Sequence, residues 1–377
     1  MVIVLAVGPA TAESVNSDVR SVSIQEYEKF GVVYANAVHN KDIQKVARLF
    51  DMKSFAYLSA RTVYDSKTEV DAYVEGVTRV KKEDFLSQIL KESFKRDVDV
   101  KFLRLLKGNR PLIRIDFKEG GHEYIILDVK STTDNNLVVN DMFILTTGRK
   151  LSETMGAVTQ LMLRPGKSVL MKIFGKSEID DNTLRSIREL ANLRKKGKYK
   201  EAYDLIESFP DALKNKRVMI DMTIQLAQSI NDEEYRKQLS RLDKYYGNDE
   251  TTAFILIDHY HYTENYNKAQ LSINRLINKY GEDGALLNLK ASTSYVEKNY
   301  IKSIAYAKKA IKVEPQFESA YWTLATSLTD EEDFRELINV LNVIEKKFGY
   351  TFNAENFMGN DFYLKFVKSS EFKARYN

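Results

Sequence analysis

The sequence predicts an N-terminal α+β domain, with helices packed on a four-stranded antiparallel meander, followed by an all-α helical solenoid. Two observations support this division. Apolar residues recur at helical spacing as far as residue 94 and then alternate with polar residues from 98 to 146, which indicates helices followed by strands. Between residues 250 and 350 the same pattern returns every 34 residues, which is typical of stacked helix pairs.

Length and composition limit the classes of protein that need to be considered. The chain has 377 residues, 44% of them hydrophobic and 29% charged, which is ample for two domains with cores of their own. Its net charge is only +4 and it contains no long basic run, so nucleic-acid binding has little support. The absence of cysteine excludes disulfides, thiol catalysis and cysteine metal sites.

Residues 1–12 form a short apolar run that ends in Ala10-Thr11-Ala12, the pattern of small residues found at signal-peptide cleavage sites. No basic residue precedes the run, so we interpret it as a truncated signal peptide and expect cleavage after Ala12. This predicts export, in a bacterium to the periplasm. The alternatives are an apolar N-terminal strand and a cytoplasmic location. The run is too short to span a bilayer, and no later stretch is long enough.

Residues 13–147 are expected to form the α+β domain. Its first helix begins near Ser23, and its apolar face contains Phe30, Tyr34 and Val38. Further helical stripes follow up to residue 94. Alternation then predicts strands over residues 98–102, 113–117, 123–130 and 137–146, joined by turns that include the hairpin signal Gly120-Gly121. Helices followed by such a meander resemble the nuclear-transport-factor-2-like (NTF2-like, cystatin-like) fold over about residues 21–147.

The NTF2-like resemblance is architectural and rests on no sequence motif. It implies a pocket between the sheet and the helices. The superfamily includes isomerases, dehydratases and inert binding domains, so the fold does not by itself assign a function.

Residues 148–180 are expected to form a helical connector. It is too hydrophobic for a flexible linker, so we expect it to pack between the two domains and fix their orientation. Helix pairs then occupy residues 181–377. The first has Gly197 at its turn, a degenerate pair should lie at about 216–246, and the aromatic tail from Phe352 should cap the last repeat.

The clearest repeats have an aromatic residue at the start of the second helix, at Tyr266, Tyr300 and Phe334. Small residues such as Ala291 let the helices approach closely, and Pro315 ends a helix because it has no backbone N–H. A single pair cannot bury its own apolar face, so neighbouring pairs must stack. This pattern of small residues, an aromatic and a closing proline resembles the tetratricopeptide repeat (TPR) family, although the usual glycine after the first-helix leucine is missing.

The TPR resemblance implies a function and a binding surface. Members of this family bind ligands on the concave face formed by the first helix of each pair. Carried over in register, the groove positions are Phe254, Asp258, His261, Asn288, Ser292, Tyr295, Ser319, Trp322 and Thr326. Trp322 is the only tryptophan of the sequence and a suitable aromatic anchor. The alternative is that the C-terminal tail covers Trp322, which would make it an ordinary core residue.

Three groups of residues suggest chemistry, and none forms a complete motif. Gly166-Lys167-Ser168 ends like a phosphate-binding loop, but Leu161 occupies the position where that loop requires glycine. Asp258, His259 and His261 could bind a metal, but His259 points away from the other two on a helix and no third ligand is near. His122 and Asp141 could act as an acid–base pair. Since the apolar residues of the third strand occupy its other face, we expect both side chains to face solvent.

We therefore interpret the chain as a non-enzymatic scaffold that binds a protein or peptide in the groove of a TPR-like array. The prediction includes no cofactor, no metal and no transmembrane segment. The alternative is an enzyme of the isomerase or dehydratase kind, or a small-ligand receptor, that uses the pocket of the N-terminal domain. The tyrosines of the N-terminal helices could line such a pocket, but core packing explains them more simply (Tyr27, Tyr34, Tyr57, Tyr64 and Tyr73).

Overall fold

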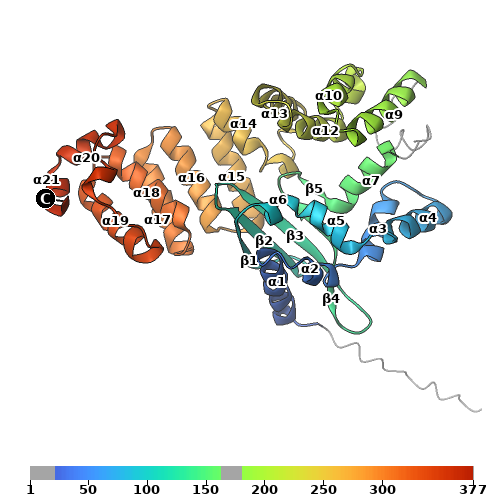
Figure 1. The fold of residues 1–377 in the computed structure, drawn as a ribbon, viewed down its shortest axis with the longest axis horizontal. Helices are drawn as coiled ribbons and strands as arrows, with labels where there is room; N and C mark the ends of the chain where they lie inside the picture. The colour runs from blue at the N-terminus through green and yellow to red at the C-terminus, as the bar shows by residue number, and fades with distance from the viewer. Residues whose placement is uncertain (1–21, 163–180, 377) are drawn as a thin grey trace, which may run out of the picture.

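The computed structural model describes residues 22–162 and 181–376. Within these residues, an antiparallel sheet with its covering helices is followed by a curved array of helices (Figure 1). The predicted signal peptide, its cleavage site after Ala12 and the Gly166-Lys167-Ser168 segment lie outside the described residues. No helix in the described parts is both long enough and apolar enough to cross a membrane.

Helices α1 to α6 precede the sheet. Helix α1 (Ile24–His39) begins where Ser23 and Glu26 satisfy each other's backbone N–H groups in a capping box. It is followed by α2 (Ile43–Arg48), α3 (Met52–Arg61), α4 (Lys67–Thr78), α5 (Lys82–Ile89) and α6 (Lys91–Lys95).

The sheet contains one strand more than the sequence predicts. Its strands are β1 (Val98–Leu106), β2 (Arg110–Phe117), β3 (His122–Ser131), β4 (Leu137–Ile144) and β5 (Arg149–Lys150), and each pairs antiparallel with the next. The extra strand, β5, has two residues, too few to produce a visible alternation. The glycines at the β2–β3 turn, Gly120 and Gly121, both adopt the positive φ that the two-glycine signal predicts.

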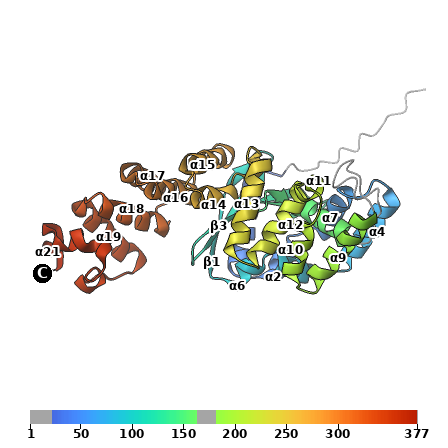
Figure 2. The ribbon, with the colours of Figure 1, turned by 90° about the horizontal axis from the view of Figure 1, so that it is seen from above.

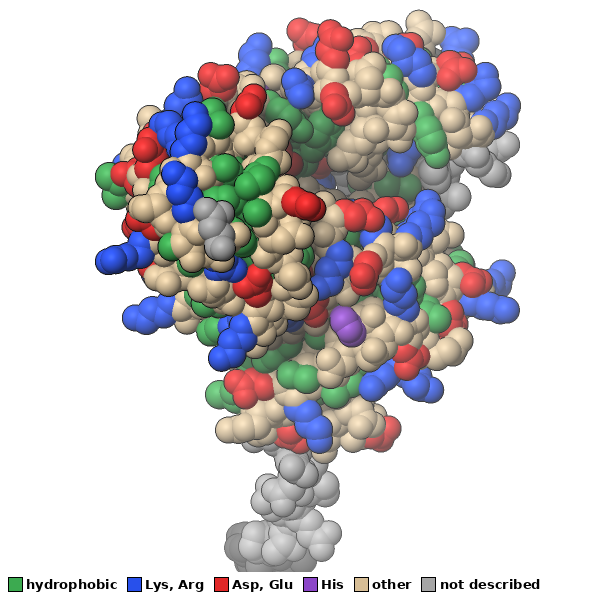
Figure 3. Space-filling view, turned by 60° about the vertical axis from the view of Figure 1, so that its left-hand side comes forward, with side chains coloured by type: hydrophobic (Ala, Val, Ile, Leu, Met, Phe, Trp, Pro, Cys, Tyr) green, Lys and Arg blue, Asp and Glu red, His purple; other side chains and the backbone are tan. Residues whose placement is uncertain are grey.

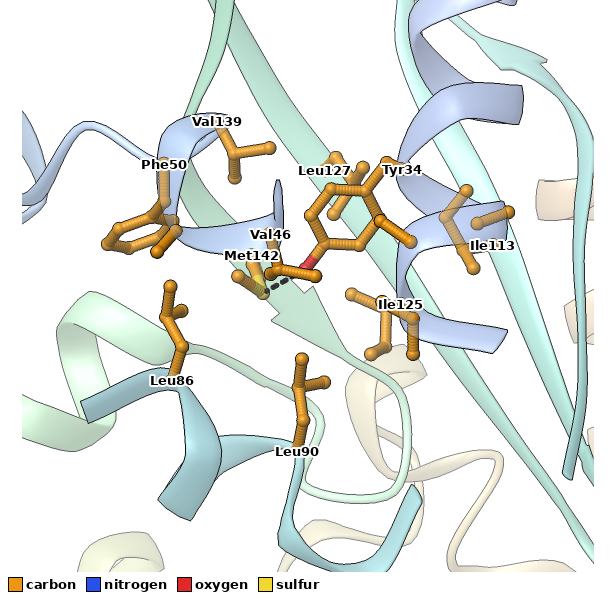
Figure 4. Close-up of a cluster of buried hydrophobic side chains, with 14 of the residues drawn as sticks. Tyr34, Val46, Phe50, Leu86, Leu90, Ile113, Ile125, Leu127, Val139 and Met142 are labelled. Atoms are coloured by element: carbon orange, nitrogen blue, oxygen red, sulfur yellow. Dashed lines mark hydrogen bonds between the residues drawn. The ribbon is translucent and has the colours of Figure 1, made fainter. Parts of the chain in front are cut away.

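One face of the sheet forms the N-terminal core with the helices before it. Ile113, Ile125 and Leu127 point from this face toward α1, and all three are buried. Tyr34 of α1 is fully buried among them and its hydroxyl lies 3.7 Å from the sulfur of Met142. Figure 4 shows side chains from both layers filling the space between them. This is the space in which the NTF2-like resemblance implies a pocket.

Helix α7 (Leu151–Met162) connects the sheet to the array. Leu151 and Met155 pack on the N-terminal core. A Cβ added at Gly156 would collide with Thr62 just after α3, so only the smallest residue allows this close approach. On another side, α7 shares a cavity wall with α12, where Val158 lies near Val218. The described part of the connector thus lies between the two halves of the protein.

The array consists of helix pairs that follow one another along a gentle arc (Figures 1 and 2). The first pair is α9 (Asp181–Lys195) and α10 (Tyr199–Glu207), and the short α11 (Asp211–Lys214) follows it. The next four pairs are α12 (Arg217–Gln228) with α13 (Asp232–Tyr246), α14 (Leu256–Tyr262) with α15 (Tyr266–Tyr280), α16 (Gly284–Val296) with α17 (Tyr300–Val313), and α18 (Glu318–Asp330) with α19 (Phe334–Phe348).

The turns inside these pairs share the same local chemistry. Helices α13, α15, α17 and α19 start 34 residues apart. Each is preceded by Asn or Asp, whose side chain accepts a hydrogen bond from the backbone N–H three residues later (Asn231, Asn265, Asn299 and Asp333). In the last three turns the residue before this cap has a positive φ (Glu264, Lys298 and Glu332). The repeat seen in the sequence is therefore a repeat of backbone conformation.

The C-terminal tail packs on the last pair. It contains α20 (Leu364–Lys368) and α21 (Ser370–Tyr376). Phe357, Phe366 and Phe372 are buried against apolar residues of α19, including Leu337 and Ile344. The tail therefore covers an apolar face that a further repeat would otherwise cover.

Candidate functional site

The second face of the sheet packs against the helical array. The sequence predicted that His122 would face solvent on this side, and this prediction was wrong. His122 keeps 14% of its side-chain exposure, and Tyr124 on the same face is completely buried. The sheet is covered on both faces because the array supplies a second apolar layer. The sheet side of this second core consists of Leu112, Tyr124, Ile126 and Leu145, and the array side consists of Ala253, Ile257, Ile273, Leu276, Tyr280 and Leu286.

Successive strands of the sheet contact successive helix pairs of the array, from β5 at one end to β1 at the other. At one end, Arg149 of β5 pairs with Asp221 near the start of α12 at 2.7 Å. In the middle, the ring of Tyr124 on β3 meets Phe254, just before α14, at 5.6 Å between centroids. At the other end, Lys101 of β1 lies 3.1 Å from Glu314, which follows α17. The sheet therefore contacts three successive helix pairs, and Figure 1 shows it beside α15 in the middle of the array.

Arg114 of β2 is the centre of a buried ionic network in this interface. Its guanidinium is completely buried and contacts three carboxylates. It pairs with Asp116 through two nitrogens at 2.7 and 2.8 Å, with Asp283 at 3.0 Å, and with Glu314 at 2.7 and 2.8 Å. Asp283 also caps α16 by accepting the N–H groups of residues 285 and 286, and it accepts the hydroxyl of Tyr124. One strand thus holds a helix start and a helix end of the array.

Arg114, Asp116 and Glu314 of this network remain charged at neutral pH, because their mutual contacts raise the pKa of the arginine and lower the pKa of both carboxyls. Burial alone would lower the pKa of Arg114, but Glu314 and Asp116 outweigh burial and raise it well above its ordinary value. Burial would likewise raise the pKa of Asp116, yet the hydrogen bond from His122 and the charge of Arg114 hold it at about 2. The interface therefore contains buried charges that compensate one another, and removing any one of them would leave an uncompensated charge in the interior.

A pocket of about 370 Å³ lies where the sheet meets the first helices of three successive pairs. The space-filling view shows the surface hollowed between the helical lobe and the sheet domain (Figure 3). The sheet domain contributes the β2–β3 turn and the residues after β4, and the array contributes α12, α14 and α16 with the start of α13. The lining residues are Gly121, His122, Thr146, Thr147, Asp221, Ile224, Gln225, Gln228, Tyr235, Phe254, Ile255, Ile257, Asp258 and Leu289.

The two carboxylates that line the pocket differ in their surroundings. Asp221 accepts hydrogen bonds from Arg149 and Arg217, each at 2.7 Å. Asp258 keeps its side chain in contact with solvent and has no hydrogen bond or ion pair within residues 22–162 and 181–376. The low polarity around Asp258 raises the pKa of its carboxyl. Asp221 therefore holds the two halves together, while Asp258 is available to a ligand.

A third acidic group lies just behind the pocket wall. Glu123 accepts hydrogen bonds from the hydroxyl of Thr146 and from the backbone N–H of Tyr124, the latter at 2.9 Å. Burial raises the pKa of Glu123 to about 7, although these hydrogen bonds oppose the shift. No sequence pattern marked this residue, because its burial depends on the packing of the whole interface.

The structure brings two of the nine predicted groove residues into this pocket, Phe254 and Asp258. From α16, Leu289 lines the pocket instead of its neighbour Asn288. Asn288 is buried, and its side-chain oxygen has no hydrogen-bond partner among the described residues. Ser292 is half-buried on the same helix. The remaining positions lie elsewhere: His261 hydrogen-bonds Thr293 at 2.8 Å, Tyr295 donates to Asp330 at 2.6 Å, Thr326 donates to the carbonyl of Trp322, and Ser319 is exposed.

Trp322 lies against the C-terminal tail. Its ring makes edge contacts with Tyr350 and Phe352, with centroids 5.1 and 5.8 Å apart, and its N–H donates to Glu318 at 3.0 Å. The indole is half-buried and belongs to the rim of the C-terminal core. This placement corresponds to the alternative in which the tail covers Trp322.

The two residue groups that suggested chemistry are not brought together. Nδ1 of His122 lies 2.7 Å from Asp116, whereas Asp141 accepts hydrogen bonds from the N–H and hydroxyl of Ser152. Asp141 is buried, so the prediction that its side chain would face solvent was also wrong. His259 is buried near Asp243, away from the pocket that Asp258 lines. In the described parts of the chain, no group of three or more His, Cys, Asp or Glu side chains has a geometry that could hold a metal ion.

Comparison with known proteins adds little to these observations. A scan of protein families and a search of curated proteins both found no match. Among solved structures, a MamA mutant matches 44% of this chain and 99% of its own length, at 15% identity and a TM-score of 0.34. A TM-score of that size does not establish a shared fold.

Proposed function

We propose that this protein is a non-enzymatic scaffold that binds a segment of a protein or peptide in the pocket between the sheet and helices α12, α14 and α16. The proposal rests on which parts of the chain line the pocket. Three successive first helices supply one side, and the sheet domain supplies another. A concave site with apolar walls and a few polar groups is the usual form of a ligand site.

We further propose that the array is of the TPR type and that the N-terminal domain is NTF2-like. The 34-residue spacing of helix starts and the shared turn chemistry support the first assignment. The order of helices and antiparallel strands supports the second. The proposed export to a bacterial periplasm rests on residues 1–12 of the sequence, and the cytoplasm stays the alternative.

Two observations favour a scaffold over an enzyme or receptor that uses the N-terminal domain. Core side chains such as Tyr34 and Met142 fill the space between sheet and helices where that alternative requires a pocket (Figure 4). The acid–base pair suggested by the sequence is divided, since His122 and Asp141 have different partners.

Filling the pocket is expected to abolish peptide binding without unfolding the protein. Peptides would be selected from a random display library on the full chain and their affinities measured by calorimetry. Gln225 lines the pocket with an exposed side chain, so Gln225→Trp adds bulk to the pocket and leaves the core intact. We expect Gln225→Trp to weaken the binding of the selected peptides by about tenfold or more, because the indole fills the pocket and prevents the peptide from making its central contacts there.

Gln316→Trp is the matched control, because Gln316 is an exposed glutamine of the same array that does not line the pocket. It should leave affinity within about twofold of the original. Thermal unfolding of both variants checks that each is folded. Equal loss of binding in both variants, or no loss in Gln225→Trp, would place the binding surface elsewhere.

A further inference from the structure

The pocket carries an unbalanced negative charge. Of its two carboxylates, Asp221 pairs with Arg149 and Arg217, and the second arginine is balanced by Asp249, which lies 3.6 Å from Arg217. Asp258 has no lysine, arginine or histidine partner within the described ranges 22–162 and 181–376. The arginines that line or approach the pocket are thus already committed to Asp221. A ligand that enters the pocket therefore meets one net negative charge.

The Asp258 side chain reaches solvent, but apolar neighbours reduce the hydration of its carboxyl. Apolar side chains from three segments, Ile224, Ile255 and Leu289, contribute to the same pocket. They raise the pKa of the Asp258 carboxyl, because the ionised carboxylate loses hydration there and no positive charge replaces it in the free protein. A cation brought next to it supplies that compensation, and the low polarity of the walls strengthens the attraction.

The other polar and aromatic groups suit a long basic side chain. Phe254 and Tyr235 provide ring surfaces, on which the stem or the charged head of such a side chain can pack. Gln225 and Gln228 add amide oxygens that accept hydrogen bonds, and both side chains are exposed. An arginine, with five N–H donors in a planar fork, can use several of these acceptors at once.

We propose that the pocket binds a basic side chain of the partner, arginine or lysine, and that Asp258 is its counter-ion. This rests on the proposed function, because it names the chemistry that the same pocket recognises. The pocket volume of about 370 Å³ admits the whole side chain with part of its flanking backbone.

A double-mutant cycle tests the counter-ion directly. Peptides selected on the full chain from a random display library are sequenced, and the leading peptide is remade with citrulline in place of its basic residue. Citrulline keeps the shape of arginine and removes the charge. Affinities of both peptides are measured by calorimetry for the original protein, for Asp258→Asn and for the control Glu331→Gln, an exposed carboxylate at the end of α18.

We expect one position of the selected peptides to be enriched in arginine or lysine. Citrulline should weaken binding to the original protein and to Glu331→Gln by about tenfold or more, as for a partly desolvated ion pair. Asp258→Asn should weaken the basic peptide by a similar factor and should then bind both peptides almost equally. That non-additivity is the signature of a direct pair.

Two results would overturn the inference and leave the proposed function intact. One is a set of pocket-dependent peptides without a basic residue, and the other is a citrulline effect of the same size in Asp258→Asn. If the library yields no peptide that binds the full chain, the proposed function fails together with the inference.

Discussion

Replacing Arg114 with methionine is expected to lower the free energy of unfolding by about 3–5 kcal/mol, because removing one member of a buried ionic network leaves its partners uncompensated. Asp116, Asp283 and Glu314 would all lose the guanidinium that now lies within 3.0 Å of each. Methionine keeps much of the length of the side chain, so the change removes charge more than volume. Urea unfolding followed by circular dichroism measures the effect.

Arg79→Met is the matched control. Arg79 pairs with Glu75 on the surface of α4, and its side chain is 75% exposed. An exposed pair of this kind contributes at most about 1 kcal/mol, so the control should stay within that limit. A loss of stability in Arg114→Met no greater than in the control would mean that the network does not hold the sheet to the array.

The second large effect concerns Glu123 and depends on pH. Its pKa is raised from 4.5 to about 7 by burial, so the folded state keeps its proton at a pH where the unfolded state loses it. This group therefore contributes stability below pH 4.5, and the contribution is lost as pH rises toward 7. Glu123→Gln keeps the shape, carries no charge and removes this dependence.

The measurable quantity is the difference in unfolding free energy between Glu123→Gln and the original protein, followed from below pH 4.5 to above pH 7. Each unit of pKa shift corresponds to about 1.4 kcal/mol, and partial contact with water reduces the total. As pH rises through this range, we expect the unfolding free energy of Glu123→Gln to increase by about 2–3 kcal/mol relative to that of the original protein. Other titrating groups are common to both proteins and cancel. A difference that stays constant with pH would show that Glu123 ionises normally in the folded state.

The helical spacing of the array could be predicted from sequence because local chemistry sets it. The caps Asn265, Asn299 and Asp333 fix where the second helices begin, and each acts on a backbone N–H only three residues away. The positive φ at Glu264 and Lys298 could not be predicted, since neither residue is glycine. It follows from the close turn between two packed helices.

The sheet could be predicted one strand at a time, but its environment could not. Alternation identified β1 to β4, and it correctly put His122 and Tyr124 on one face. Assigning that face to solvent was wrong, because what covers it comes from more than a hundred residues later in the chain. Leu112 and Ile126, apolar on the same face as Tyr124, are the signal in the sequence that both faces are buried.

The candidate site could be predicted only in part for a similar reason. The repeat register predicted Phe254 and Asp258 as groove residues, and both line the pocket. On α16 it predicted Asn288, whereas the residue that lines the pocket is Leu289. Helix α16 is buried on most of its sides, so its packing against the sheet and its neighbouring helices decides its rotation. The pairing of Arg114 with Asp283 joins residues 169 positions apart, which no local pattern reveals.

A partner segment bound by this protein should occupy the pocket between the sheet and the first helices of the array. Amide hydrogen exchange, measured by mass spectrometry with and without a saturating selected peptide, tests it most directly. We expect slower exchange in α12, in residues 254–262 and at the β2–β3 turn, with α19 to α21 unchanged. Protection confined to α18 and the C-terminal tail, or no protection at saturation, would contradict it.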